Sequence, residues 1–246
     1  MMRTKEEIAK MRKAGKVVAE IVETTKAYIK PGVTTLDVDK VAREVIERRG
    51  ARSNFLNYHG FPAVICSSPN DVIVHGIPGG YVIEEGDIVS IDQGAIVEGY
   101  HGDAAYTVAV GEVSPLARRL LEVTEKSLWA GIEQMQAGNR LNDIGRAVQS
   151  VAEAAGFSVV RKYVGHGIGT AMHEEPQIPN YYPGVPGPKL KVGHVFAIEP
   201  MVNVGKPDTV ELDDGWTVVT ADGTLSAHFE HTIAITDDGP EVLTVA

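Results

Sequence analysis

The 246-residue chain has one cysteine (Cys66), few aromatic residues (6%) and fewer basic than acidic residues. A single cysteine excludes an intramolecular disulfide and is typical of a reducing compartment. The net charge of −10 argues against direct nucleic-acid binding, which needs a basic face to displace counterions. No segment approaches the roughly 18 uncharged apolar residues of a membrane span, and no secretory leader is visible. We therefore expect a cytoplasmic protein without membrane contact.

The rest of the composition, 43% hydrophobic and 23% charged, is that of a globular protein. Apolar residues at helical spacing, with caps at their ends, predict four helices. Runs rich in β-branched residues predict strands, two of which form a hairpin. Five prolines and two glycines in 176–188 predict a surface loop there. The helices are expected at about 4–30 and 35–49, from 115 through at least 129, and at about 142–155. The strands are expected at 64–66, 72–74, 88–97, 101–110, 157–160, 195–198 and 232–235.

The second half of the chain repeats the first. Residues 31–50 match 137–156 without gaps, and residues 86–92 match 193–199. In the second match each segment has a glycine, a polar residue, an apolar run and then a carboxylate. The repeat is too long for a solenoid. We therefore predict one α+β domain over 1–246, built from halves at about 4–111 and 112–246 that are related by a pseudo-two-fold axis.

Four acidic residues flank predicted core strands in matched pairs: Asp92, Asp103, Glu199 and Glu230. Any one of them alone is better explained as a turn or strand-end residue. Four converging carboxylates taken out of water would repel each other and cost several kcal/mol unless cations neutralise them. No Lys or Arg lies between Asp92 and Asp103 or from Asp208 through Glu230. The pattern therefore favours a metal site at the predicted strand ends.

His166, in the glycine-rich run 165–169, is the best candidate for a nitrogen ligand beside these acids. Carboxylates with one imidazole suit harder divalent ions, and four carboxylates suit two ions; Mn, Fe, Co and Zn all accept the set. The absence of H-E-x-x-H, paired cysteines and G-x-S-x-G disfavours a one-zinc protease, a zinc finger and a serine hydrolase. His75 and His173 are ordinary loop histidines or, beside a metal centre, hydrogen-bonding groups for a substrate.

Eight short motifs recur in order along essentially the whole chain, and together they resemble the type I methionine aminopeptidase family. The motifs are N-Y-H-G-F-P (57–62), V-H-G-I-P (74–78), I-D-Q-G (91–94), G-D (102–103), G-H-G-I-G (165–169), H-E-E-P-Q-I-P-N (173–180), I-E-P-M (198–201) and F-E-H-T (229–232). The resemblance implies the pita-bread fold, a curved and mainly antiparallel sheet covered by helices in two pseudo-symmetric halves. It also implies that Asp92 binds one divalent ion, that His166 and Glu199 bind a second, and that Asp103 and Glu230 bridge both.

The implied reaction is removal of the initiator methionine from nascent polypeptides with a small second residue, by a hydroxide bound between the two ions. By the same resemblance, Glu199 shuttles the proton, His173 stabilises the oxyanion and His75 hydrogen-bonds the substrate amide. An apolar pocket is implied for the methionine side chain, although each of its residues is equally explained as core. The substrate-binding candidates are Phe55, Tyr58, Phe61, Cys66, His75, Met172, His173 and Trp216. The expected partners are a peptide N-terminus and the ribosome, and the expected state is a monomer.

Three alternatives stay open at this point. The first is an X-Pro peptidase of the same fold, although such enzymes usually carry an extra N-terminal domain. The second is a peptide-binding protein of this fold without catalysis. The third is a metal-free hydrolase of the creatine-cleaving kind. The type II methionine enzymes are excluded because the 31 residues from Glu199 to Glu230 leave no room for their helical insertion.

Overall fold

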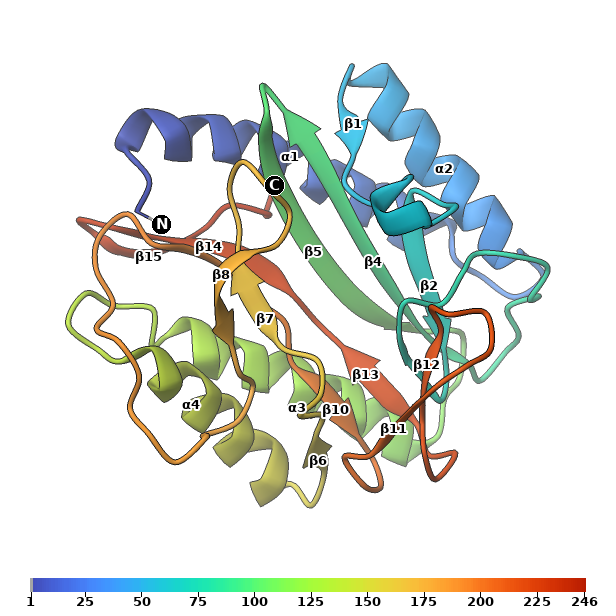
Figure 1. The fold of residues 1–246 in the computed structure, drawn as a ribbon. Helices are drawn as coiled ribbons and strands as arrows, with labels where there is room; N and C mark the ends of the chain where they lie inside the picture. The colour runs from blue at the N-terminus through green and yellow to red at the C-terminus, as the bar shows by residue number, and fades with distance from the viewer. Residues whose placement is uncertain (1) are drawn as a thin grey trace.

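The computed structural model describes residues 2–246, in which two pairs of helices lie behind a set of curved antiparallel strands (Figure 1). Helices α1 and α2 pack on each other, as do α3 and α4. The helices are α1 (Lys5–Tyr28), α2 (Thr35–Arg48), α3 (Pro115–Ile132) and α4 (Leu141–Ala154). The strands are β1 (Arg52–Ser53), β2 (Ile65–Pro69), β3 (Val72–Val74), β4 (Ile88–Val97), β5 (Tyr100–Ala109), β6 (Ser158–Val159), β7 (Gly165–Gly167), β8 (Glu174–Ile178), β9 (Val195–Ile198), β10 (Met201–Asn203), β11 (Thr209–Glu211), β12 (Val218–Thr220), β13 (Ser226–His228), β14 (His231–Thr236) and β15 (Gly239–Val242).

All four helices are where the sequence predicts them, because their caps are local signals. Thr4 and Glu7 form the predicted capping box at the start of α1. The Ser114 hydroxyl accepts from Ala117 N–H at the start of α3, where proline occupies the first helical position. No helix within residues 2–246 is both long and apolar enough to cross a membrane.

The strands β4 and β5 form the central hairpin, paired in register from Ile88↔Ala109 to Val97↔Tyr100. The turn consists of Glu98 and Gly99, both with positive φ (52° and 80°), as a two-residue hairpin turn requires. The hairpin thus follows the predicted strands at 88–97 and 101–110 to within one residue at each end. Asp92 and Asp103 lie in mid-strand, so their predicted placement at strand ends is wrong. Glu199 directly follows β9 and Glu230 directly precedes β14, as predicted.

A second prediction about the strands is partly wrong. Residues 176–178 belong to β8, the edge strand of the five-stranded sheet β15-β14-β9-β7-β8, rather than to a loop. Pairing of Gly165 with Ile178 and of His166 with Gln177 holds this segment extended despite Pro176. Proline is tolerated in an edge strand because its missing N–H costs no internal ladder bond. The loop therefore begins after Ile178.

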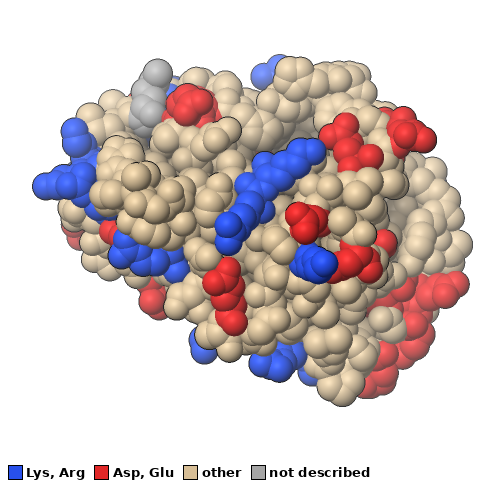
Figure 2. All heavy atoms as spheres, turned by 60° about the horizontal axis from the view of Figure 1, so that its bottom comes forward, with Lys and Arg blue, Asp and Glu red and all other residues tan. Residues whose placement is uncertain are grey.

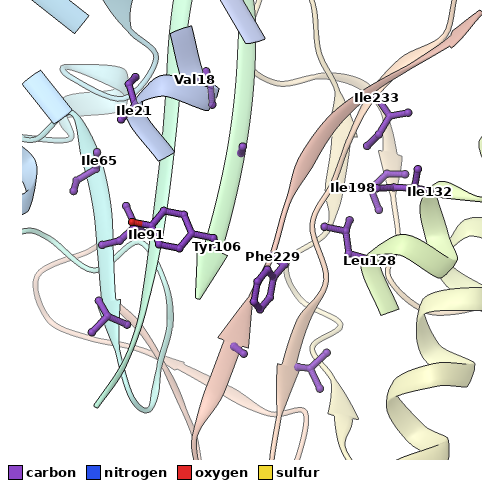
Figure 3. Packing of buried hydrophobic residues seen from close by; sticks show 14 of the residues in the cluster. Val18, Ile21, Ile65, Ile91, Tyr106, Leu128, Ile132, Ile198, Phe229 and Ile233 are labelled. Carbon is purple, nitrogen blue, oxygen red and sulfur yellow. The ribbon is translucent and has the colours of Figure 1, made fainter. Parts of the chain in front are cut away.

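The main hydrophobic core lies between the helix pairs and the strands. Figure 3 shows Ile91 and Tyr106 of the central hairpin packed toward α1, and Ile198 beside Ile132 of α3. Successive side chains of a strand point to opposite faces. Because Ile91 faces the core, the neighbouring Asp92 faces away from it, on the side opposite the helices. The packing of Ile91 in the core therefore determines the face of the sheet on which the Asp92 carboxylate lies.

The surface carries charges of both signs. On the face shown in Figure 2, Lys and Arg side chains form small groups interspersed with Asp and Glu. The order α1-α2-β4-β5 in the first half parallels the order α3-α4-β9-β14 in the second. The division of one domain at residues 111 and 112 stays a prediction.

Candidate metal centre and substrate pocket

The structure brings every predicted site residue to one cavity of about 620 Å³, which includes its open mouth. These residues come from strands and loops throughout the chain. The cavity is lined by Phe55, Tyr58, Phe61, Cys66, His75, Asp92, Asp103, His166, Met172, His173, Glu199, Trp216 and Glu230. Their convergence is the geometric basis for a single functional site, while the role of each residue remains a prediction.

One end of the cavity holds the carboxylates and His166. Ligand atoms of Asp103, His166 and Glu230 all lie within 4.8 Å of one another. Glu199 Oε1 lies 3.5 Å from His166 Nε2. Backbone hydrogen bonds link the halves here, because Glu230 N–H donates to the carbonyl of Ala105 at 2.8 Å. Distances of this order place several oxygen atoms and one nitrogen around a common centre.

A glycine makes room for one of these carboxylates. Gly94 lies opposite Asp103 in the hairpin. A Cβ atom at Gly94 would lie 2.8 Å from Asp103 Oδ1 and 2.1 Å from Asn54 Nδ2. The Asn54 amide donates to the carbonyl of Gly102 at 3.0 Å. Any larger residue at Gly94 would therefore displace Asp103 and the asparagine beside it.

The tautomer of His166 follows from its hydrogen bond. His166 Nδ1 lies 2.9 Å from the carbonyl oxygen of Gly167, which can only accept, so Nδ1 carries the proton. Burial, and then the proximity of His173, lowers the pKa of His166 to about 3, and the ring is therefore neutral at pH 7. The Nε2 lone pair is left free toward Glu199. A neutral imidazole oriented by a hydrogen bond to its other nitrogen is the state that binds a metal ion.

The carboxylates are buried so deeply that their charged forms are unfavourable without a positively charged partner. Burial raises the pKa of Asp92 to about 7. Burial first, and then the charges of neighbouring carboxylates, with Asp92 acting on all three, raise the pKa values of Asp103, Glu199 and Glu230 well above their usual range. Within residues 2–246, Asp92 Oδ1, Asp103 Oδ1 and Glu230 Oε1 are buried and have no hydrogen-bond partner. Buried oxygens that repel each other and lack donors fit divalent cations as their partners.

The other end of the cavity is apolar. Phe55, Phe61, Cys66 and Met172 form a buried cluster separate from the main core, with Trp216 packed against it. The Phe61 ring meets the Trp216 ring edge-on at 5.0 Å. Burial raises the pKa of the Cys66 thiol well above its usual value. Cys66 is therefore an inert thiol that is both buried and part of the cavity wall.

His173 and His75 lie between the two ends. The His173 ring stands edge-on to His166 at 4.3 Å, and its Nδ1 is 2.7 Å from the Tyr58 hydroxyl. When the phenol donates this hydrogen bond, the imidazole proton sits on Nε2, which becomes a donor. His75 adopts a positive φ of 61° and contacts Trp216 edge-on at 6.5 Å. Burial lowers the pKa of His75 to about 4, so its ring is neutral at pH 7.

The sequence reasoning missed His228. Its Nε2 lies 3.7 Å from Glu199 Oε2, so two imidazoles flank this carboxylate. In the part of the chain that the structure describes, His228 Nε2 is buried and has no hydrogen-bond partner. One signal was available, because residues two apart in an extended segment share a face, and His228 precedes Glu230 by two.

A buried cluster of carboxylates and one imidazole, next to an apolar pocket, is typical of a metal-dependent hydrolytic site. The chain belongs to metallopeptidase family M24, whose model matches residues 9–237. It is similar to the methionine aminopeptidase of Clostridium perfringens, with 50% identity, covering 100% of this chain and 98% of that protein. It is also similar to methionine aminopeptidase 1 of Bacillus subtilis, with 51% identity and 98% coverage of both chains.

Solved structures agree with this assignment. The methionine aminopeptidase of Thermotoga maritima matches with a TM-score of 0.97, 45% identity and 100% coverage of both chains. That of Rickettsia prowazekii matches with a TM-score of 0.97 and 44% identity, covering 100% of this chain and 99% of the other. The Pyrococcus furiosus prolidase, at 23% identity and a TM-score of 0.81, covers 100% of this chain and 65% of the other, and shares the fold. The predicted α+β pita-bread fold and the class of metallo-aminopeptidase are confirmed.

Proposed function

We propose that this protein removes the N-terminal methionine from polypeptides whose second residue is small. The observation that carries the proposal is a single cavity with buried, unpartnered carboxylate oxygens at one end and an apolar cluster at the other. Similarity along the full chain to methionine aminopeptidases supports the same substrate. Nascent chains as substrates, the ribosome as a partner, a monomeric state and a cytoplasmic location stay predictions.

The five polar residues would hold two divalent ions. Asp92 would bind one ion, His166 and Glu199 the other, and Asp103 and Glu230 both; Mn, Fe, Co and Zn all accept these donors. When bound, a pair of such ions polarises the scissile carbonyl and makes a water acidic enough to react near neutral pH. The neutral Nε2 of His166 and the unpartnered oxygens of Asp92, Asp103 and Glu230 fit this role.

The side chains around these ligands would carry the proton transfers. Glu199 reaches the cavity with its side chain 15% exposed, and we assign it to take the proton of the attacking water and pass it to the leaving amine. His173, with Nδ1 hydrogen-bonded to Tyr58, offers Nε2–H to the carbonyl oxygen as charge develops. His75, which is neutral and lines the cavity, is assigned to hydrogen-bond the substrate amide.

The apolar cluster gives the side-chain specificity. An unbranched thioether adapts to an irregular apolar space and makes favourable contacts with aromatic rings, which Phe55, Phe61 and Trp216 supply. We infer that the hydrogen-bonded rings of His173 and Tyr58, which both line the cavity, also limit the space for the second residue. We therefore assign the preference for a small second residue to this pair.

A competition assay tests the proposal. Metal-stripped protein is mixed with Met-Ala, Met-Lys, Leu-Ala and Ala-Pro peptides, Mn²⁺ or Co²⁺ is added, and products are followed by mass spectrometry. We expect methionine to be released from Met-Ala, and only with metal. An apolar pocket typically discriminates by about 10–200-fold between side chains, which sets the expected ratio of rates on Met-Ala and Leu-Ala.

Equal rates on Met-Ala and Met-Lys would contradict the assigned subsite, and preferential cleavage of Ala-Pro would favour the X-Pro alternative. Folded protein without any cleavage would favour a peptide-binding role.

Metal should stabilise the protein, and more so at higher pH. The raised pKa values of Asp103, Glu199 and Glu230 mean that the folded, metal-free state holds protons more tightly than the unfolded chain, where carboxyl pKa values are about 4. The metal-free protein therefore loses stability as pH rises above about 4 toward the raised values. Metal requires the deprotonated carboxylates, so its stabilising effect grows over the same range.

Thermal unfolding at pH 5.5 and pH 8, with and without Mn²⁺, measures this effect. Ligand at 100 times its Kd adds about 2.7 kcal/mol to the free energy of unfolding, which is a shift of several degrees in Tm. We expect the larger shift at pH 8. The Glu112→Gln variant, which changes a carboxylate with 92% side-chain exposure, is the control and should behave as wild type. A shift that is absent, or larger at pH 5.5, would contradict the carboxylate site.

A further inference from the structure

Arg3 is buried and lies outside the lining of the substrate pocket. Its backbone N–H donates to the carbonyl of Gly193 at 2.7 Å, and Met2 forms a β-bridge with His194, so the segment before α1 is fixed in place. The Arg3 side chain is only 3% exposed. Its guanidinium forms an ion pair with Glu174, far away in the sequence, whose side chain is 16% exposed. A largely buried ion pair of this kind constrains the two segments that it joins.

Glu174 in turn organises the loop that precedes it. Its Oε1 accepts from Thr170 N–H at 2.9 Å and from Ala171 N–H at 3.1 Å, while its Oε2 accepts from Arg3. The guanidinium also packs directly on Gly169, where a Cβ atom would lie 2.0 Å from Arg3 Nη2. Contacts with the side chains of Arg3 and Glu174 therefore hold the backbone of the loop 169–174 in place.

The front of the same loop forms part of the proposed site. Met172, 3% exposed, belongs to the apolar cluster, and His173 faces His166 and Tyr58. Consecutive Cα atoms are 3.8 Å apart, so a displacement of Glu174 is passed directly to His173. A misplacement of about 1 Å at reacting groups costs about 10²-fold in rate.

We propose that Arg3 is a positioning residue for this site, acting through Glu174 to hold Met172 and His173 in their productive places. The inference rests on the proposed function. It assigns a kinetic role to a side chain outside the cavity, at the start of the chain. A more exposed ion pair provides a comparison, because Arg12 on α1 binds Glu241 at 2.7 and 2.9 Å and neither residue lines the cavity.

The test compares Arg3→Met, which keeps an unbranched apolar stem but removes the charge, with Arg3→Lys and Arg12→Met. Each metal-loaded variant is assayed for kcat and KM on Met-Ala, for metal affinity by calorimetry and for Tm. We expect Arg3→Met to lower kcat by about 10-fold to 10²-fold with metal affinity unchanged. Arg3→Lys should restore most of kcat, and Arg12→Met should leave kcat at the wild-type value.

A double-mutant cycle shows whether Arg3 acts through Glu174. Arg3→Met and Glu174→Gln should each lower kcat, and the double variant should lose no more than the worse single variant. If Arg3→Met lowers Tm while kcat measured well below Tm stays at the wild-type value, the ion pair stabilises the fold only and the proposal is overturned. Additive losses would also overturn it. If wild type does not cleave Met-Ala at all, the proposed function fails first, and the positioning role fails with it.

Discussion

Replacing Glu199 by glutamine lowers kcat for Met-Ala cleavage by about 10²–10⁴-fold, the usual worth of a positioned general acid–base group. The amide keeps the shape of the side chain but cannot accept a proton. The Glu199 carboxylate lies 3.5 Å from His166 Nε2 and 3.7 Å from His228 Nε2. Glu199 is also a proposed metal ligand, and the loss must therefore be measured at saturating metal.

The experiment measures kcat and bound metal on the same sample. Glu112→Gln serves as the control, because it makes the same chemical change at an exposed carboxylate that lies outside the cavity. A Glu199→Gln variant that binds metal and is slow would support the proton-shuttle role. Activity within a few-fold of wild type would show that another group transfers the proton.

Replacing Asp103 by asparagine abolishes tight metal binding and activity while raising the Tm of the metal-free protein. Asp103 is buried in β5, and burial and then the charges of Asp92 and Glu199 raise its pKa. The substitution removes the negative charge of Asp103 and therefore its repulsion from Asp92 and Glu199. In the wild-type protein only bound metal would relieve this repulsion. Loss of groups that merely support metal ligands costs about 10–100-fold in affinity or activity, so loss of a ligand shared by two ions should cost more.

The His166→Ala variant separates the loss of a metal ligand from the relief of charge repulsion. His166 is neutral because burial lowers its pKa to about 3, so its removal takes away a metal donor without relieving charge repulsion. We expect weak metal binding, as in Asp103→Asn, but no gain in the Tm of the metal-free protein. Calorimetry with Mn²⁺ and thermal unfolding in chelator measure both quantities. An Asp103→Asn variant that still binds two ions tightly would contradict its proposed bridging position.

Local signals explain what the sequence could predict. Caps and helical periodicity fixed all four helices, since these signals lie within a few residues of the ends that they define. The repeated glycine–apolar–carboxylate pattern pointed to Asp92 and Glu199, and the shortage of nearby cations pointed to metal. The ordered motifs then gave the full set of residues that the cavity brings together.

Features that depend on tertiary contacts escaped prediction. The strands of the central hairpin were predicted, but Asp92 and Asp103 lie inside them and not at their ends, because β4 and β5 stay paired in register on both sides of these residues. β8 is held by pairing with β7, which the prolines of the segment obscure. His228 had only its spacing of two residues from Glu230 as a signal. The ion pair between Arg3 and Glu174 has no local signature, because its two residues are distant in sequence.

The most direct test of the account is a metal titration followed by two readouts in one sample. Metal-stripped protein is titrated with Mn²⁺ under nitrogen, with bound metal measured by calorimetry and Met-Ala turnover by mass spectrometry. The account predicts no turnover in chelator, turnover that rises with bound metal, and binding that saturates at two ions per chain. Full turnover in chelator, or folded protein that binds no divalent ion, would contradict it.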